Sequence, residues 1–86
     1  MSYNYQIERP KLFTEDGVVM LLKIRDNCTA LLRTSGGFRA ERAWQGVTGD
    51  SWMMLAALDF LCERNEIEDV SSPGVAGQHR LFVGPR

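Results

Sequence analysis

The chain has 86 residues, of which 44% are hydrophobic and 24% charged, and its ten basic and eleven acidic residues give a formal net charge of -1. This length supports one domain with one modest core, and this composition excludes wholesale disorder. The start carries no apolar signal segment, and no stretch approaches the roughly 18 apolar residues of a membrane span, so we expect a cytoplasmic protein without a membrane partner.

The charges are unevenly distributed along the chain. Residues 1–49 have a balance of +2 and residues 71–86 again +2, whereas residues 50–70 have a balance of -5. The total charge does not indicate a polyanion partner. The acidity is concentrated in one segment in the second half of the chain.

Residues 1–13, MSYNYQIERPKLF, are interpreted as an extended N-terminal arm that precedes a domain over residues 14–86. Pro10 biases Arg9 toward an extended backbone. Tyr3, Tyr5 and Ile7 alternate, so the arm either adds an edge strand, crosses to a second subunit, or frays.

Residues 15–33 are predicted to form a helix, with Glu15 and Asp16 in its first turn and Ser35-Gly36-Gly37 after its end. Its core side would comprise Val18, Leu21, Leu22, Cys28 and Leu32. A break near Asp26-Asn27 is one variant. The alternative is a β-hairpin over residues 18–32 that turns at Asp26-Asn27, because short apolar runs with β-branched residues fit both structures.

Residues 38–47 are expected to form a short second helix, which a turn with Gly46 and Gly49 joins to a central helix over residues 50–65. Helix, tight turn and helix is the helix-turn-helix arrangement. Asp50 is suited to cap the central helix and Asn65 to end it. The remaining segments, residues 66–70 and 78–83, flank a glycine-rich loop and are expected to pair as a β-hairpin.

The central helix has apolar residues on more than one side. Its inner face would comprise Met54, Leu55, Leu58, Leu61 and Cys62. Its other side carries Trp52, Met53, Ala56 and Phe60. A helix that is apolar all round is either central in its own domain or half of an interface, so this second set is either core or a partner surface.

This order of elements resembles the winged helix-turn-helix superfamily. The residues that carry the resemblance are Leu55, Leu58, Leu61, Ile67 and Val70, in LAALDFLCERNEIEDV, followed by the wing-like SSPGVAGQHRLF. The resemblance implies an α+β winged helix with three helices and a C-terminal β-hairpin. It also implies DNA binding, with the third helix in the major groove and the wing beside the backbone.

Carried over by position, the groove-facing residues would be Thr48, Ser51, Trp52, Met53 and Ala56, and the wing contacts Gln78, His79 and Arg80. The helix positions lack the arginine, lysine, asparagine and glutamine side chains that read base edges. Arg33, Arg39, Arg42 and Arg80 would form a basic patch or a solvated scatter of charges.

Nothing in the sequence indicates an enzyme, a cofactor or a small-molecule substrate. His79 is the one histidine, and no serine or cysteine has a base at a recognisable spacing. Cys28 and Cys62 lack the further ligands of a zinc site and are expected to be reduced.

Two hypotheses follow. The first is a small winged-helix nucleic-acid-binding protein, such as a transcriptional regulator, that contacts DNA through Arg39, Arg42, Thr48, Ser51 and Arg80. The second is a winged helix used for protein contact, as a homodimer or an adaptor, with Trp52, Met53, Ala56 and Phe60 at the interface and acidic residues around it. Because one fold hosts many functions, the resemblance alone does not choose between them.

Overall fold

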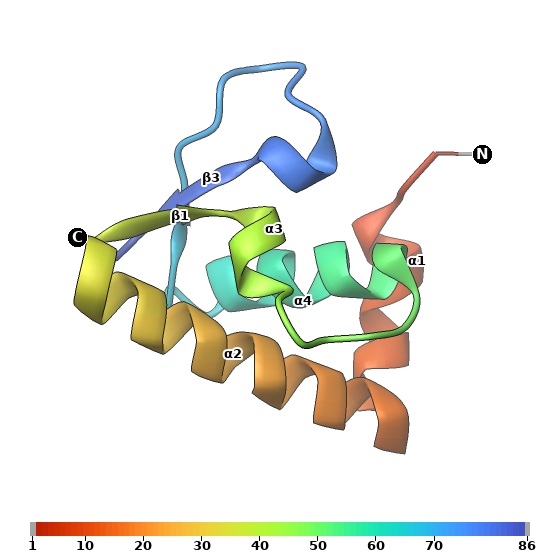
Figure 1. Ribbon diagram of the computed structural model, residues 1–86. Coiled ribbons are helices and arrows are strands. Elements are labelled where there is room, and N and C mark those ends of the chain that lie inside the picture. The colour runs from red at the N-terminus through yellow and green to blue at the C-terminus, as the bar shows by residue number, and fades with distance from the viewer. Residues whose placement is uncertain (1, 86) are drawn as a thin grey trace.

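A computed structural model describes residues 2–85 of the protein (Figure 1). The longest element in it is helix α2 (Glu15–Ser35). The Thr14 side chain caps it by accepting from the Gly17 N–H, and Gly36 ends it in the left-handed conformation at φ 75°. The helix interpretation of this segment is confirmed over the hairpin. No break occurs at Asn27, whose side chain instead donates to the carbonyl groups of Ala43 and Gln45.

The predicted central helix is α4 (Ser51–Glu63). The Asp50 side chain accepts from the Trp52 N–H at 2.8 Å, and Asn65 has a positive φ of 60° just after the helix. Both end signals in the sequence are therefore confirmed, because each acts through its own neighbouring backbone.

Of the predicted second helix over residues 38–47, only residues 40–43 are helical. Strand β1 (Gly37–Arg39) comes first, and helix α3 (Ala40–Ala43) is a single turn. Phe38 pairs with Phe82 in the sheet, and the two rings stack at 5.7 Å. Burial of Phe38 against this distant residue outweighs the local preference for a helix.

The sheet has three antiparallel strands in the order β1-β3-β2, where β2 is Glu68–Asp69 and β3 is Leu81–Val83. The predicted hairpin of β2 and β3 is confirmed, but both strands are shorter than expected. Residues 77–79 form a 3-10 turn, η2 (Gly77–His79), instead of the start of the strand. The sequence interpretation also missed the third strand, β1.

The expected extended arm is wrong, because residues 5–13 are helical. Helix α1 (Tyr5–Glu8) is capped by Asn4, and the 3-10 helix η1 (Arg9–Phe13) follows it directly. Pro10 lies in the first turn of η1, where its missing N–H costs no hydrogen bond. Arg9 is accordingly helical, with φ -49° and ψ -48°.

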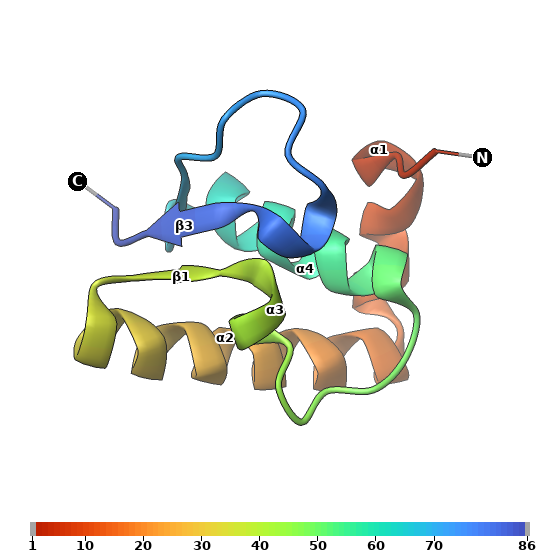
Figure 2. The ribbon, with the colours of Figure 1, turned by 45° about the horizontal axis from the view of Figure 1, so that its top comes forward.

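The N-terminal segment, residues 2–13, packs against one end of α2 and against α4, whereas the sheet lies at the other end of α2 (Figures 1 and 2). Gly17 makes this crossing possible. A Cβ atom at Gly17 would lie 2.1 Å from the Lys11 carbonyl oxygen, so no larger residue fits where η1 crosses α2.

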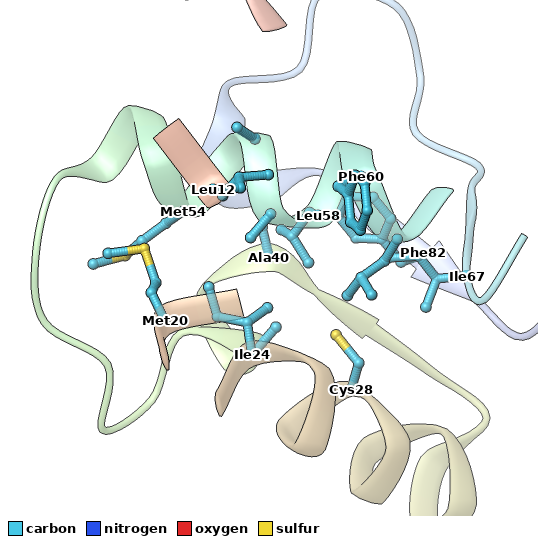
Figure 3. Close-up of a cluster of buried hydrophobic side chains, with 14 of the residues drawn as sticks. Leu12, Met20, Ile24, Cys28, Ala40, Met54, Leu58, Phe60, Ile67 and Phe82 are labelled. Atoms are coloured by element: carbon cyan, nitrogen blue, oxygen red, sulfur yellow. The ribbon is translucent and has the colours of Figure 1, made fainter. Parts of the chain in front are cut away.

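The core lies between α2, α4 and the sheet (Figure 3). Its most buried large side chains are Leu12, Ile24, Leu58, Leu61 and Phe82. On α2 the core positions belong to Met20, Ile24 and Cys28, whereas Val18 and Leu22, which we had expected on the core side, are exposed. The described residues therefore form an α+β protein whose central helix is covered from several directions.

Candidate functional site

Helix α4 is almost entirely enclosed. Of its thirteen residues only Ser51 and Glu63, one at each end, are exposed, and Ala56, Ala57 and Leu58 have no exposed surface. The 3-10 turn before β3 covers Leu55 of this helix. The approach is so close that a Cβ atom added at Gly77 would lie 2.9 Å from a methyl group of Leu55. Between its two ends, the helix therefore has no fully exposed residue.

The second apolar side of α4 is covered by the protein's own N-terminal segment. The Phe13 ring meets Phe60 edge to face at 5.6 Å, and the Arg9 guanidinium lies 5.4 Å from the centre of the Phe60 ring. Of the four predicted interface residues, Ala56 and Phe60 are thus buried inside the monomer, and the structure contradicts their assignment to a partner surface. Trp52 and Met53 remain half-buried near the start of the helix.

Two polar clusters fasten the N-terminal segment to α4. In the first, Glu63 accepts from both nitrogens Nε and Nη2 of Arg9, at 3.0 and 2.7 Å, and from the Tyr5 hydroxyl at 2.8 Å. The hydrogen bonds from Arg9, followed by that from Tyr5, lower the pKa of Glu63 to about 2. Burial, followed by the hydrogen bond to Glu63, raises the pKa of Tyr5 to about 12.

The second cluster joins the N-terminal segment, α4 and the sheet at Arg80. Nη2 of Arg80 lies 2.6 Å from Asp59 Oδ1 and 2.7 Å from Asp69 Oδ2, and the Tyr3 hydroxyl donates to the other oxygen of Asp59 at 2.5 Å. The Arg80 side chain is only 17% exposed. Burial acts to lower the pKa of Arg80, but the hydrogen bonds to Asp59 and Asp69 outweigh it and hold that pKa above its ordinary value.

The predicted role of Arg80 as a DNA contact therefore conflicts with its position. Its charge is taken up by two carboxylates, and its guanidinium carbon Cζ also lies 5.1 Å from the centre of the Phe82 ring. A phosphate group would have to compete with two carboxylates that are already in contact. Arg80 is part of the framework that holds β3 against α4.

The acidic segment of the sequence is likewise neutralised by residues from other parts of the chain. Besides the clusters at Glu63 and Arg80, Glu66 pairs with Arg25 of α2 at 2.7 Å and with Arg64 at 3.4 Å. The imbalance of -5 along residues 50–70 is thus offset in part, because three arginines distant in sequence lie beside its carboxylates. Four of the acidic residues that we had expected as a rim around an interface, Asp59, Glu63, Glu66 and Asp69, are in ion pairs within the chain.

The other predicted nucleic-acid contacts are exposed but divided between two places. Arg39 on β1 and Arg42 on α3 make no ion pair within residues 2–85, and they line one hollow of about 290 Å³ together with Glu41. Thr48 lines a different hollow of about 390 Å³, between α2 and the turn before α4, which also contains Asp16, Lys23 and Asp50. The two hollows share no residue, and Ser51 lines neither.

Three of the exposed large apolar residues lie together on α2, and one of them, Val19, also lines the hollow at Thr48. Val19 is 52% exposed, Leu22 is 49% exposed, and Val18 is exposed beside them. Phe13, just before the helix, is also exposed. The sequence could have located this group if a different side of the helix had been chosen as the core side. When the helical wheel is centred on Ile24 in place of Leu21 and Leu22, Val18, Val19 and Leu22 fall on the outside.

The remaining polar side chains do not assemble a reactive centre within the part of the chain that the structure describes. No three histidine, cysteine, aspartate or glutamate residues there are grouped as metal ligands, and no helix there is long and apolar enough to cross a membrane. His79 is exposed. Cys28 and Cys62 are not joined in a disulfide, and burial raises the pKa of Cys28 to about 12 and that of Cys62 to about 11.

Comparisons of the chain with models of protein families, with curated proteins and with solved structures found no match.

Proposed function

We propose that this chain is a winged-helix-like domain that acts through contact with another protein and does not read DNA with its central helix. The order helix, strand, helix, helix, strand, strand supports the winged-helix assignment, with α2, β1, α3, α4, β2 and β3 in those places and the sheet order β1-β3-β2. In such a fold α4 would be the recognition helix.

The enclosure of α4 is the observation that supports protein contact over DNA readout by this helix. Direct readout needs side chains of a helix to reach base edges in the major groove. Here the middle of the helix is covered by Phe13 on one side and by the turn at Gly77 on another. Ser51 is the one hydroxyl group left at the exposed start, and its neighbour Asp50 carries a charge that repels phosphate.

Exposed apolar surface supports protein contact as the alternative. The group on α2, Val18, Val19 and Leu22, has no covering segment within residues 2–85. Contiguous apolar residues that a fold leaves outside are typical of interaction sites. These residues are therefore the expected contact surface of the domain.

A titration of labelled duplex DNA with the protein tests this function. We expect no salt-dependent binding at micromolar protein, whether the salt is low or moderate, because α4 carries no arginine, lysine, asparagine or glutamine to contact phosphates or bases. Tight binding whose affinity falls steeply with salt would contradict the proposal.

DNA binding through a different face is the second candidate, and it is favoured by Arg39 and Arg42, which share one hollow and make no ion pair within residues 2–85. Such binding would be weak, because few phosphate contacts supply little affinity. If DNA binding is observed, Arg39→Ala with Arg42→Ala should remove it. Lys23→Ala serves as the matched control, because it removes an exposed charge from a different hollow, which Gln45 and Gly46 also line.

A further inference from the structure

Strand β1 forms a free edge of the sheet. In the order β1-β3-β2 it has a neighbouring strand on one side only (Figure 2). Just past the strand, the Ala40 N–H donates to the Arg80 carbonyl at 2.9 Å. Because backbone groups alternate between the two sides of an antiparallel strand, those of Phe38 also point toward β3, and those of Gly37 and Arg39 point away from it. The edge therefore offers the Arg39 N–H and the Gly37 carbonyl to an added strand.

The hollow of about 290 Å³ lies along this edge and has two different faces. All three residues of β1 line it, and Leu31 of α2 and Leu81 of β3 supply apolar surface. Arg39 and Leu81 are partners in the register, so their side chains lie on the outer face of the sheet, where Leu81 is 40% exposed. Phe38 is buried on the inner face, which packs toward α2 and the half-buried Leu31. The space beside β1 is thus charged on its outer face and apolar on its inner face.

The charge available in this hollow is positive. Arg39 and Arg42 are exposed there and make no ion pair within residues 2–85, although Glu41 also lines the hollow. Arg80, by contrast, is already held by two carboxylates. A guanidinium group binds a carboxylate through two parallel hydrogen bonds, and such charge-assisted pairs are stronger than neutral ones. The hollow therefore favours a ligand with carboxylate groups.

We infer that β1 binds an extended segment of another protein in which acidic and apolar residues alternate, and that this segment joins the sheet as an additional strand. The inference rests on the proposed function and names the chemistry of its partner. Side chains of a strand point alternately to the two faces of a sheet. The apolar set of the partner would lie against Leu31, and the acidic set would meet Arg39 and Arg42. The binding surface is separate from the apolar group on α2.

An acidic strand uses every feature of this site, whereas the other occupants use only some of them. Two arginines supply few phosphate contacts to a DNA duplex, which would use neither the apolar surface nor the free backbone groups. A second copy of the chain, paired edge to edge, would bring Arg39 and Arg42 of both copies together, and like charges across an interface oppose association. The combination of a free edge, apolar surface and unpaired arginines therefore favours a peptide with carboxylates.

Fluorescence anisotropy with two labelled synthetic peptides tests the inference. In the first peptide valine and glutamate alternate, and the second has the same composition with all valines before all glutamates. We expect the alternating peptide to bind with a dissociation constant of about 100 µM, because a short edge forms few hydrogen bonds. The second peptide should bind about tenfold more weakly, since it cannot place one residue type on each face. Equal affinities, or no binding of the alternating peptide up to about 1 mM, would overturn the inference.

A pair of substitutions tests the role of the charges. Arg39→Ala with Arg42→Ala should raise the dissociation constant of the alternating peptide about tenfold or more, because it removes two charged donors. Arg33→Ala is the matched control and should leave the affinity unchanged. Arg33 is exposed near the end of α2 and does not line the hollow, and on the helical wheel it lies opposite Leu31. A double variant that is folded by circular dichroism and binds as tightly as the original protein would overturn the inference.

Heteronuclear NMR of the unaltered protein locates the peptide and needs no variant to fold. The amide signals of Gly37 and Arg39 should shift most on addition of the alternating peptide, and shifts confined to another face would overturn the inference. The same titration with duplex DNA separates the two classes of ligand: tighter binding of DNA than of the peptide at this edge would assign it to nucleic acid instead. The peptide measurements contain no DNA, so they can fail while the DNA titration still supports protein contact.

Discussion

Replacement of Arg80 by alanine should destabilise the fold, because Arg80 belongs to the framework and not to a DNA-binding surface. The substitution leaves Asp59 and Asp69 without their shared cation, and their side chains are only 19% and 32% exposed. Breaking a fully buried ion pair costs about 3–5 kcal/mol, and exposed pairs are worth about 0–1 kcal/mol. Since this cluster is partly screened, we expect a loss of about 2 kcal/mol in the free energy of unfolding.

Urea unfolding followed by tryptophan fluorescence measures this loss at unchanged m-value. The corresponding fall in melting temperature is about 8–16 °C for a domain of this size. Arg42→Ala is the matched control, because Arg42 is exposed and has no ion pair within residues 2–85, and it should change stability by less than about 0.5 kcal/mol.

A double-mutant cycle with Asp59→Asn assigns the effect to the ion pair. Because Arg80 and Asp59 are in contact at 2.6 Å, the two losses should not add, and the coupling should lie within about 0.5–3 kcal/mol. An Arg80→Ala variant as stable as the Arg42→Ala variant would refute the reasoning. Arg80 would then be free to meet a phosphate group, and the DNA hypothesis would regain its wing contact.

Three further predictions concern other parts of the fold. Gly17→Ala should destabilise the protein by more than about 1 kcal/mol, although alanine is the better helix former by about that amount, because its methyl group would collide with the backbone of η1; thermal melting measures the sign. As the pH falls from about 4.5 to about 2, Glu63 becomes protonated, and the stability that its lowered pKa contributes above that window is lost. We expect the environment of Tyr5 to change over this range in near-ultraviolet circular dichroism, and a signal that stays flat down to pH 2 would contradict the link between Tyr5, Arg9 and Glu63. Finally, Cys28 should react slowly with iodoacetamide at pH 8 in the folded protein and quickly in urea, because burial raises its thiol pKa to about 12 and keeps the reactive thiolate scarce; equal rates in both states would show that the site is open to solvent.

The two long helices could be predicted from the sequence because their signals are local. Thr14 and Asp50 cap helices through their own side chains, and Gly36 and Asn65 adopt left-handed conformations at the ends. These interactions join residues a few positions apart, so the residue types at those positions are sufficient to predict them. The hairpin of β2 and β3 was predictable for the same reason, from the glycine-rich loop between two short apolar segments.

Only the tertiary structure decided which surfaces remain outside. That α4 is apolar on two sides was evident from the sequence, but Phe13 and Arg9 cover the second side from about fifty positions away. Phe38 is in a strand because it pairs with Phe82, so the predicted second helix does not begin at Phe38. The identity of an apolar residue does not show which residue will bury it, because burial of apolar surface is non-directional. The tertiary structure decides which residues come into contact.

The charges follow the same rule. The acidic excess of residues 50–70 was real in the sequence, yet Arg9, Arg25 and Arg80 offset three of its five charges in the fold. Coulomb attraction depends on distance in space and not on separation along the chain. The sequence therefore determined the two long helices, their ends and the α+β class of the protein, and the fold determined which arginines and which apolar residues are left for a partner.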